Sequence, residues 1–306
     1  MRFLVLGAGA VGGYFGGRLA EGGADVTFLV RPARAKRLRE TGLVVTSPVG
    51  DFRVTPQLAT ADTLSGNYDV IVLTAKHYDL DQAVAAIAPA VGAQTAILPL
   101  LNGLVHLDRL DAAFGQERVL GGVAYVGATL LPDGGIRHHN RLNAITFGDR
   151  PSGISERARA IEAAFADSRT TATASDNVML DMWEKFVMIT AMASMNCLMR
   201  GTVGDIAATE EGAQLTVEAL AECQAVAAAA GFAPRAPYVE RIRGMLTERG
   251  SVNSASMRHD LEGGSRTEAD ALIGDMLRRG RHFGVPTPLL RAAFCHMQVH
   301  ENRLAA

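Results

Sequence analysis

Short apolar runs alternate with amphipathic segments along the first half of the chain. The runs of strand length cover residues 2–6, 25–30, 68–74 and 95–98. Segments 11–21, 79–90 and 155–166 have the character of helices. Two more strand-like runs, 119–127 and 144–148, lie on either side of a Pro-Asp-Gly-Gly turn. Alternating strands and helices of these lengths predict a mostly parallel, doubly wound α/β sheet.

The pattern changes near residue 175. From residue 177 to the end there is almost no strand signal, and glycine and proline residues separate the helical segments. We therefore expect two domains, a doubly wound α/β domain over residues 1–172 and an all-helical domain over residues 173–306. A chain of 306 residues is long enough for both to have a sizeable core.

A glycine motif follows the first strand at once. The residues are Gly7-Ala8-Gly9-Ala10-Val11-Gly12, which have the spacing G-x-G-x-x-G between a strand and a helix. Gly7 permits a tight turn, Gly9 lets a pyrophosphate approach the backbone, and Gly12 lets the helix pack close to its strand. The helix N-terminus then holds the phosphates. A glycine-rich turn that serves packing alone is the alternative to this Rossmann dinucleotide site.

The residue after the second strand bears on the choice of cofactor. In a Rossmann domain it lies near the adenine ribose, where NAD enzymes usually carry an acid. This chain has Arg31 there, with Arg34, Lys36 and Arg37 close behind. A guanidinium pairs bidentately with a phosphate, so the sequence favours NADP(H). The alternative is a solvated, basic start of a helix.

Composition narrows the class of protein. The net charge is −2, so there is no basic surface for nucleic acid. Three distant cysteines form no disulfide framework, which suits a reducing compartment. No apolar run reaches the roughly 18 residues of a membrane span, and the N-terminus lacks a signal peptide pattern. We expect a cytoplasmic enzyme with no nucleic-acid or membrane partner.

Lys185 is a single cation among apolar neighbours at positions 182, 186 and 189 of a predicted helix. A partly desolvated lysine has a lowered pKa and can donate a proton near neutral pH. Lys185 could equally be a lysine whose stem covers core surface while its ammonium reaches water.

Several further segments follow one another in a familiar order: the glycine motif, Lys76 after a long strand, and residues 99–103, 183–186, 254–260 and 267–268. Together these segments resemble the ketopantoate reductase (2-dehydropantoate 2-reductase) family. The resemblance runs in order along nearly the whole chain. It implies a Rossmann domain, a helical domain and a substrate cleft between them. The implied reaction is the NADPH-dependent reduction of 2-dehydropantoate to D-pantoate, a step of pantothenate and coenzyme A biosynthesis.

The resemblance also implies roles for single residues. Lys185 would be the general acid that protonates the carbonyl oxygen as hydride arrives, and Glu268 would hydrogen-bond the new hydroxyl and hold the ammonium in place. Asn102 and Ser256 resemble substrate ligands, Asn102 also lying near the nicotinamide. An ammonium there agrees with the chemistry, because hydride transfer builds negative charge on the oxygen. On the cofactor side, Lys76 and Arg31 resemble the family's cations.

One departure from the family concerns the substrate. The family usually carries substrate-binding asparagines four and eight residues after its catalytic lysine. Here those positions hold Ile189 and Ala193, and the nearest candidate amide is Asn196. Losing two amides should weaken recognition of a substrate hydroxyl or carboxylate. The substrate therefore stays open between 2-dehydropantoate and another small 2-keto acid or ketone.

Further expectations concern an alternative function, the oligomeric state and three histidines. An NADP-binding redox sensor without catalysis would share the scaffold, although it would not need a lysine–glutamate pair. A homodimer through the C-terminal helices follows from the frequency of two-fold symmetry. We expect His138 and His139 to be a solvated pair without metal, and His106 to be a satisfied structural histidine.

Overall fold

The computed structural model describes residues 1–150 and 153–305, which form two compact units. The first unit contains Met1–Leu101 and His106–Val178, and the second contains Asn102–Val105 and the chain from Met179 onward. The predicted boundary after residue 172 is therefore misplaced. It would cut the strand β10 (Thr171–Ala174), which pairs with the sheet of the first unit.

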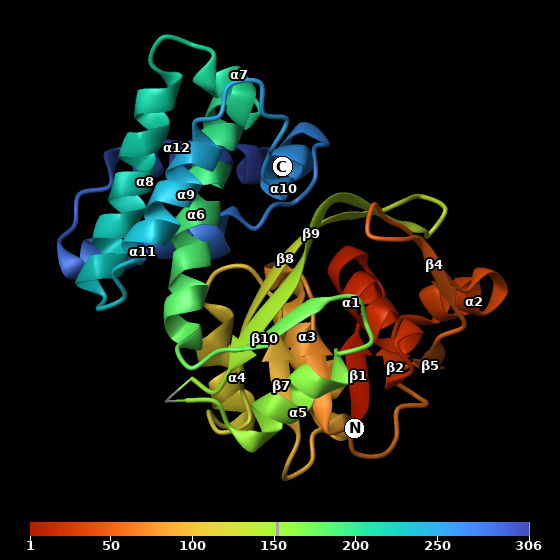
Figure 1. The fold of residues 1–306 in the computed structure, drawn as a ribbon. Helices are drawn as coiled ribbons and strands as arrows, with labels where there is room; N and C mark the ends of the chain where they lie inside the picture. Colours follow the sequence, from red (N-terminus) through yellow and green to blue (C-terminus); the bar gives the residue numbers. More distant parts are fainter. Residues whose placement is uncertain (151–152, 306) are drawn as a thin grey trace. The chain divides into compact units, whose positions relative to one another are not determined.

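The first unit contains a parallel sheet in the order β5–β2–β1–β6–β7 (Figure 1). The predicted doubly wound sheet is confirmed, because the apolar runs are its buried central strands. The strands are β1 (Arg2–Leu6), β2 (Asp25–Leu29), β5 (Gln57–Ala59), β6 (Val70–Leu73) and β7 (Ala96–Pro99). The helices of this unit are α1 (Ala10–Glu21), α2 (Pro32–Thr41), α3 (Leu80–Ile87), α4 (His106–Phe114) and α5 (Glu156–Ala164), with 3-10 turns at His77–Asp79 and Ala88–Ala90.

The same unit contains a second sheet that the sequence pattern did not predict. Its order is β10–β9–β3–β4, and β8 pairs with β9 in the expected hairpin. Three of its strands, β3, β4 and β10, have only three or four residues, too few to show a period of two. The remaining bounds are β3 (Leu43–Thr46), β4 (Phe52–Val54), β8 (Gly121–Leu130) and β9 (Ile136–Gly148).

Helix α1 packs against both sheets and is buried on every side from Gly12 to Leu19. A side chain at Gly16 would come within 2.8 Å of the ring of Phe28 on β2. One at Gly17 would come within 2.8 Å of the ring of Phe52 on β4. The small residues after the glycine motif therefore allow two sheets to approach a single helix.

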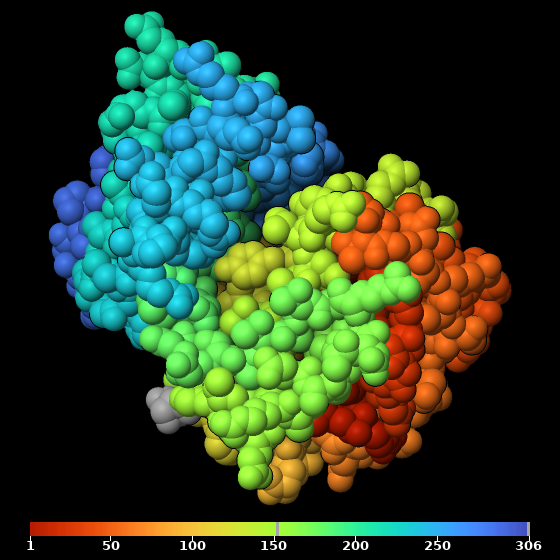
Figure 2. All heavy atoms as spheres, in the orientation of Figure 1, coloured from red at the N-terminus to blue at the C-terminus, as the bar shows by residue number. Residues whose placement is uncertain are grey.

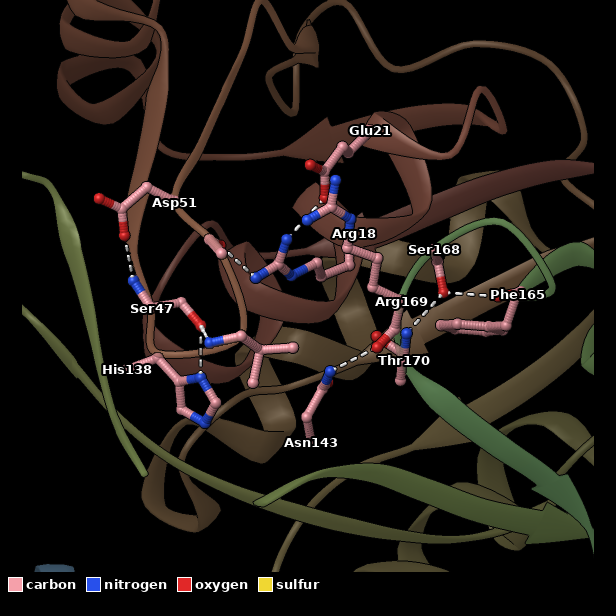
Figure 3. Close-up of polar contacts among 12 residues, drawn as sticks. Arg18, Glu21, Ser47, Asp51, His138, Asn143, Phe165, Ser168, Arg169 and Thr170 are labelled. Carbon is pink, nitrogen blue, oxygen red and sulfur yellow. Dashed lines mark hydrogen bonds and ion pairs between the residues drawn. The ribbon is translucent and has the colours of Figure 1, made fainter. Parts of the chain in front are cut away.

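A buried arginine ties α1 to the second sheet (Figure 3). Arg18 has no exposed surface, and its guanidinium donates to the Glu21 carboxylate at 2.7 Å and to the Gly50 carbonyl at 2.6 Å. The same group lies over the ring of Phe52, 4.3 Å from its centroid. It also lies over the ring of Tyr14, 5.4 Å from its centroid, so its charge is balanced by one carboxylate, one carbonyl and two aromatic faces.

His138 belongs to the same buried region, which corrects the expectation of a solvated histidine pair. Its Nε2 lies 2.9 Å from the Leu142 carbonyl. Its Nδ1 lies 2.8 Å from the Ser47 hydroxyl (Figure 3). A carbonyl only accepts, so Nε2 carries the proton and Ser47 donates to Nδ1. His139 is exposed, because successive residues of a strand face opposite sides.

The second unit is all-helical, as predicted. Residues Asn102–Val105 leave the first unit and pack here: Gly103 has a φ of +78°, and a side chain on it would come within 3.0 Å of the Ala271 carbonyl. No helix of the described ranges is long and apolar enough to cross a membrane. The helices are α6 (Val178–Met199), α7 (Val203–Ala207), α8 (Gly212–Ala229), α9 (Ala236–Leu246), α10 (Ser256–Glu262), the π-helical turn η3 (Asp270–Gly274), α11 (Asp275–Phe283) and α12 (Pro288–Ala305).

Candidate active-site residues

The glycine motif forms the turn from β1 into α1, with the geometry that a dinucleotide requires. Gly7 has a φ of +88°, a conformation that side chains disfavour. A side chain on Gly12 would collide with the Gly7 carbonyl and the Thr74 hydroxyl, whereas one on Gly9 would meet nothing within 4 Å. Close packing thus requires Gly12, and the space above Gly9 is open for a phosphate.

Two residues that the sequence analysis did not assign to this loop hold it in place. Thr74, just after β6, donates from Oγ1 to the Leu6 carbonyl at 2.8 Å. Arg34, on α2, donates from Nη2 to the Ala8 carbonyl at 2.8 Å. The signal for Thr74 was its place at the carboxyl end of a strand, where open α/β sheets bind ligands.

The start of α2 carries a basic cluster of Arg31, Arg34 and Arg37. Arg31 precedes the helix and is exposed, while Arg37 donates to the Pro132 carbonyl at 3.0 Å. That carbonyl lies at the tip of the β8–β9 hairpin. In Figure 2 the yellow-green atoms of this hairpin lie beside the orange atoms of the region between α2 and β4. None of the three guanidinium groups pairs with a carboxylate of the described chain.

The charge of Arg34 is incompletely compensated. It is half-buried, and its Nε is buried without a hydrogen-bond partner. Burial lowers the pKa of Arg34, and the nearby charge of Arg37 lowers it further. An anion bound beside Arg34 and Arg37 would relieve both effects, and a phosphate has the geometry for it. Lys76, the other predicted cation, precedes the His77–Asp79 turn and is half-buried.

Lys185 lies on α6 beside two of its predicted partners. Its Nζ donates to Oδ1 of Asn102 at 3.0 Å. Burial lowers the pKa of Lys185 to about 8, and the attraction of the Glu268 carboxylate limits that fall. The sequence left open whether this lysine is desolvated or extends into water. The structure favours the partly desolvated ammonium, because the lysine is half-buried and burial is the larger influence on its pKa.

A buried ion pair between Glu184 and Arg235 also fixes the turn of α6 that carries Lys185. Glu184 is 1% exposed and accepts hydrogen bonds from the backbone N of Arg235 at 2.8 Å and from its Nε at 2.9 Å. Arg235 also donates to Asp181 at 2.5 Å. Trp183, in the same turn, stacks on Phe232 with ring centroids 5.6 Å apart. Sequence reasoning missed this ion pair, although an acidic residue beside the lysine in an apolar helix was a visible signal.

Asn196 does not fit the predicted role of a substrate ligand. It is 1% exposed, its Oδ1 accepts from the backbone N of Ala255 at 2.9 Å, and its Nδ2 donates to the Gly201 carbonyl at 2.8 Å. The amide therefore ties α6 to the residue just before Ser256. Ser256 itself is exposed and begins α10.

His106, in the first unit, corrects another expectation. It is fully buried, yet neither ring nitrogen has a hydrogen-bond partner within the described ranges. Burial lowers the pKa of His106 to about 3, with smaller contributions from His77 and Arg150. Its ring centroid lies 5.9 Å from that of His77. The histidine is thus kept neutral by burial rather than satisfied by hydrogen bonds.

Comparison with known proteins agrees with this arrangement. Residues 3–152 match a family model described as "Ketopantoate reductase PanE/ApbA", and residues 177–301 match "Ketopantoate reductase PanE/ApbA C terminal". An uncharacterized oxidoreductase, YkpB of Bacillus subtilis, is 35% identical over 98% of this chain and 99% of its own length. A 2-dehydropantoate 2-reductase of Halobacterium salinarum is 31% identical over 95% of this chain and 96% of its own.

A solved structure extends the likeness to the whole fold. The PanE/ApbA family ketopantoate reductase of Ralstonia eutropha has a TM-score of 0.89 and 27% identity, with both chains covered completely. The protein is therefore an oxidoreductase that belongs to the ketopantoate reductase family, whose members depend on NAD(P)H.

Proposed function

We propose that this protein reduces the C2 ketone of a small 2-keto acid to a hydroxyl with NADPH, and that Lys185 is the general acid. The observation that carries the proposal is the Lys185 ammonium itself. It is partly desolvated, lies 3.0 Å from the Asn102 amide oxygen and is attracted by Glu268. The relatives named 2-dehydropantoate 2-reductase make reduction of 2-dehydropantoate to D-pantoate the first reaction to test.

In this proposal the protein supplies orientation and a proton. The nicotinamide supplies the hydride when it is bound. Lys185 Nζ gives its proton to the ketone oxygen, which gains negative charge as C2 is reduced. A pKa of about 8 suits this task, because the ammonium is mostly protonated at neutral pH and is still acidic enough to donate. Asn102 orients Nζ, and Glu268 stabilises the charged form of the lysine before the transfer.

We further propose that residues 7–12, Arg31 and Lys76 bind the cofactor, and that the cofactor is NADP(H). Support comes from the open space above Gly9 and from the uncompensated charge at the start of α2. A 2′-phosphate beside Arg31 would meet guanidinium groups that no carboxylate of the described residues neutralises. In an NAD(H) enzyme an acidic residue usually occupies this position instead.

Substitution of Lys185 by alanine tests the proposed function. We expect kcat with 2-keto acids to fall by about 10²–10⁴-fold, the usual contribution of a positioned acid, while the Kd for NADPH stays within about twofold. Steady-state turnover and fluorescence titration of NADPH measure the two quantities. A variant that keeps wild-type kcat would refute the role of Lys185. A wild-type protein that binds NADPH but reduces no 2-keto acid would support the redox-sensor alternative.

The substrate has a second candidate, another small 2-keto acid in place of 2-dehydropantoate. The structure favours keeping it, because Ile189 lies one helical turn from Lys185 and offers no hydrogen-bonding group. A panel of 2-keto acids compared by kcat/KM decides between the candidates.

A further inference from the structure

The accessible face of α6 near Lys185 is a narrow stripe. Lys185, Met188, Ile189 and Met192 are half-buried, whereas the residues between them and Ala193 are buried. Spacings of three, four and seven residues place the four side chains on one face of the helix. Ala193, which the sequence analysis associated with the substrate, has no exposed surface and does not belong to this face.

The chemistry of the stripe changes abruptly after the lysine. Asn102 and Glu268 accompany the ammonium, but the next three accessible positions carry one branched hydrocarbon and two thioethers. Helical side chains lean toward the N-terminus, so Met188 and Ile189 cover the turn that begins at Lys185. A group that extends from a ketone held at Nζ along α6 would therefore contact apolar atoms.

We propose that the preferred substrate is a 2-keto acid whose side chain is purely hydrocarbon, aliphatic or aryl, and that Met188, Ile189 and Met192 contact this side chain. The inference rests on the proposed function of Lys185. A hydroxyl placed on this stripe loses its hydrogen bonds to water and gains none from these side chains, whereas a methyl group gains contacts. The unbranched methionines adapt to side chains of different shape.

Two substrates that differ by one hydroxyl test the preference. They are 2-dehydropantoate, which is 4-hydroxy-3,3-dimethyl-2-oxobutanoate, and its deoxy analogue 3,3-dimethyl-2-oxobutanoate. We expect the wild-type protein with NADPH to show a kcat/KM at least about tenfold higher for the deoxy analogue. A higher kcat/KM for 2-dehydropantoate, or equal values, would overturn the inference and leave the proposed reductase function standing.

A substitution at the centre of the stripe provides the second arm. Ile189→Asn supplies an amide, so we expect the preference for the deoxy analogue to fall by about tenfold, mainly through better use of 2-dehydropantoate. Ile189→Leu is the matched control and should keep the wild-type ratio. An unchanged ratio in Ile189→Asn would contradict the assignment of Ile189. Circular dichroism melting and NADPH titration of both variants establish that each is folded.

Failure of the underlying function has a different signature. If the wild-type protein binds NADPH but oxidises it with neither compound nor with any member of a 2-keto acid panel, the reductase proposal fails and this inference fails with it. A reversed preference between the two matched substrates affects the substrate class alone.

Discussion

At the scale of single residues, the chemistry of Lys185 is set by neighbours that are remote in the sequence. Its position on an apolar helix lowers the pKa, and Glu268 opposes that shift. The two effects leave an ammonium that is charged at neutral pH and still able to donate. Neither Lys185 nor Glu268 alone would give an ammonium with this balance of charge and acidity. The two residues together are therefore the functional unit of the proposal.

Removing the charge of Glu268 should therefore change the pH dependence of turnover. In Glu268→Gln the pKa of Lys185 should fall below its value of about 8, because only desolvation remains. A general acid must be protonated, so kcat/KM declines as pH rises through this pKa, and the decline should begin at lower pH in the variant. Profiles of kcat/KM from pH 6 to 10 measure the shift. Glu218→Gln, on the exposed side of α8, is the control and should not move the profile.

Arg31 offers a test of cofactor choice. Arg31→Asp places a carboxylate near the proposed 2′-phosphate, so we expect the ratio of kcat/KM for NADPH to that for NADH to fall by at least about tenfold. Arg39→Asp, an equal charge change in the last turn of α2, should leave the ratio near its wild-type value. Equal effects of both substitutions would show that general electrostatics, and not a phosphate contact at Arg31, sets the preference.

At the scale of elements, α6 is the helix that positions the proposed site. One turn bears Lys185 and is fixed by the buried pair of Glu184 with Arg235. Three turns further on, Asn196 bonds the backbone just before Ser256. The helix thereby connects the start of α9, the start of α10 and the proposed acid through side chains that do not themselves react.

The ion pair of Glu184 with Arg235 should contribute measurably to the stability of the fold. Arg235→Ala leaves a buried carboxylate with only a backbone donor, so we expect the free energy of unfolding to fall by about 1–3 kcal/mol. Urea denaturation measures this change. Arg243→Ala removes an exposed arginine of α9 that lies 4.0 Å from Glu240, and it should change the free energy by less than about 1 kcal/mol. If both variants lost a similar free energy of unfolding, leaving the buried Glu184 without its arginine would cost no more than removing an exposed arginine.

Whether an element could be predicted depended on how many consecutive residues carry its hydrophobic pattern. The strands of the parallel sheet were visible because they are buried on both faces and read as continuous apolar runs. By contrast, β4 with its three residues has no period to detect, and its place is fixed by pairing with β3. The buried side of His138 could not be deduced either, because strand register decides which of two neighbouring residues faces inward.

At the scale of the whole molecule, the burial of titratable side chains makes the stability of the fold depend on pH. His106 is buried and neutral in the first unit, and its pKa of about 3 lies below the 6.5 of an unfolded chain. Between these values the unfolded state binds more protons than the folded state. Stability should therefore fall as pH decreases from 6.5 toward 3, at up to about 1.4 kcal/mol per pH unit from this residue.

The substitution His106→Leu should flatten that dependence. It removes a buried imidazole whose nitrogens have no partners, and it leaves an apolar side chain of similar volume. Urea unfolding at pH 7.0 and 5.0 should show a smaller loss of stability in the variant than in the wild type. Part of the loss should persist, because burial also lowers the pKa of His138. His139→Leu, at an exposed position, is the control; an unchanged pH dependence in His106→Leu would refute the assignment.

The homodimer expected through the C-terminal helices stays a prediction at this scale. Val299 and Phe283 are exposed apolar residues of the helical unit, with 45% and 40% of their surface accessible. Light scattering coupled to size-exclusion chromatography would give the mass in solution, and a mass near 32 kDa at micromolar concentration would contradict the expectation.

The sequence by itself determined the features whose signal is local. Apolar runs, helical periods and the glycine motif specify the doubly wound sheet, the tight turn after its first strand and the helical second half, because each depends on residues that are adjacent along the chain. The resemblance to a family supplied the pairing of Lys185 with Glu268, which no spacing could reveal.

Only the tertiary structure decided which side chains share an environment. It placed Asn102 in the helical unit beside Lys185, buried Asn196 and Ala193, and left Met188 and Met192 half-buried along α6. These outcomes depend on packing between segments far apart in the chain. Burial then sets which groups lose water, and the loss of water sets the pKa and the hydrogen bonding from which the proposed chemistry follows.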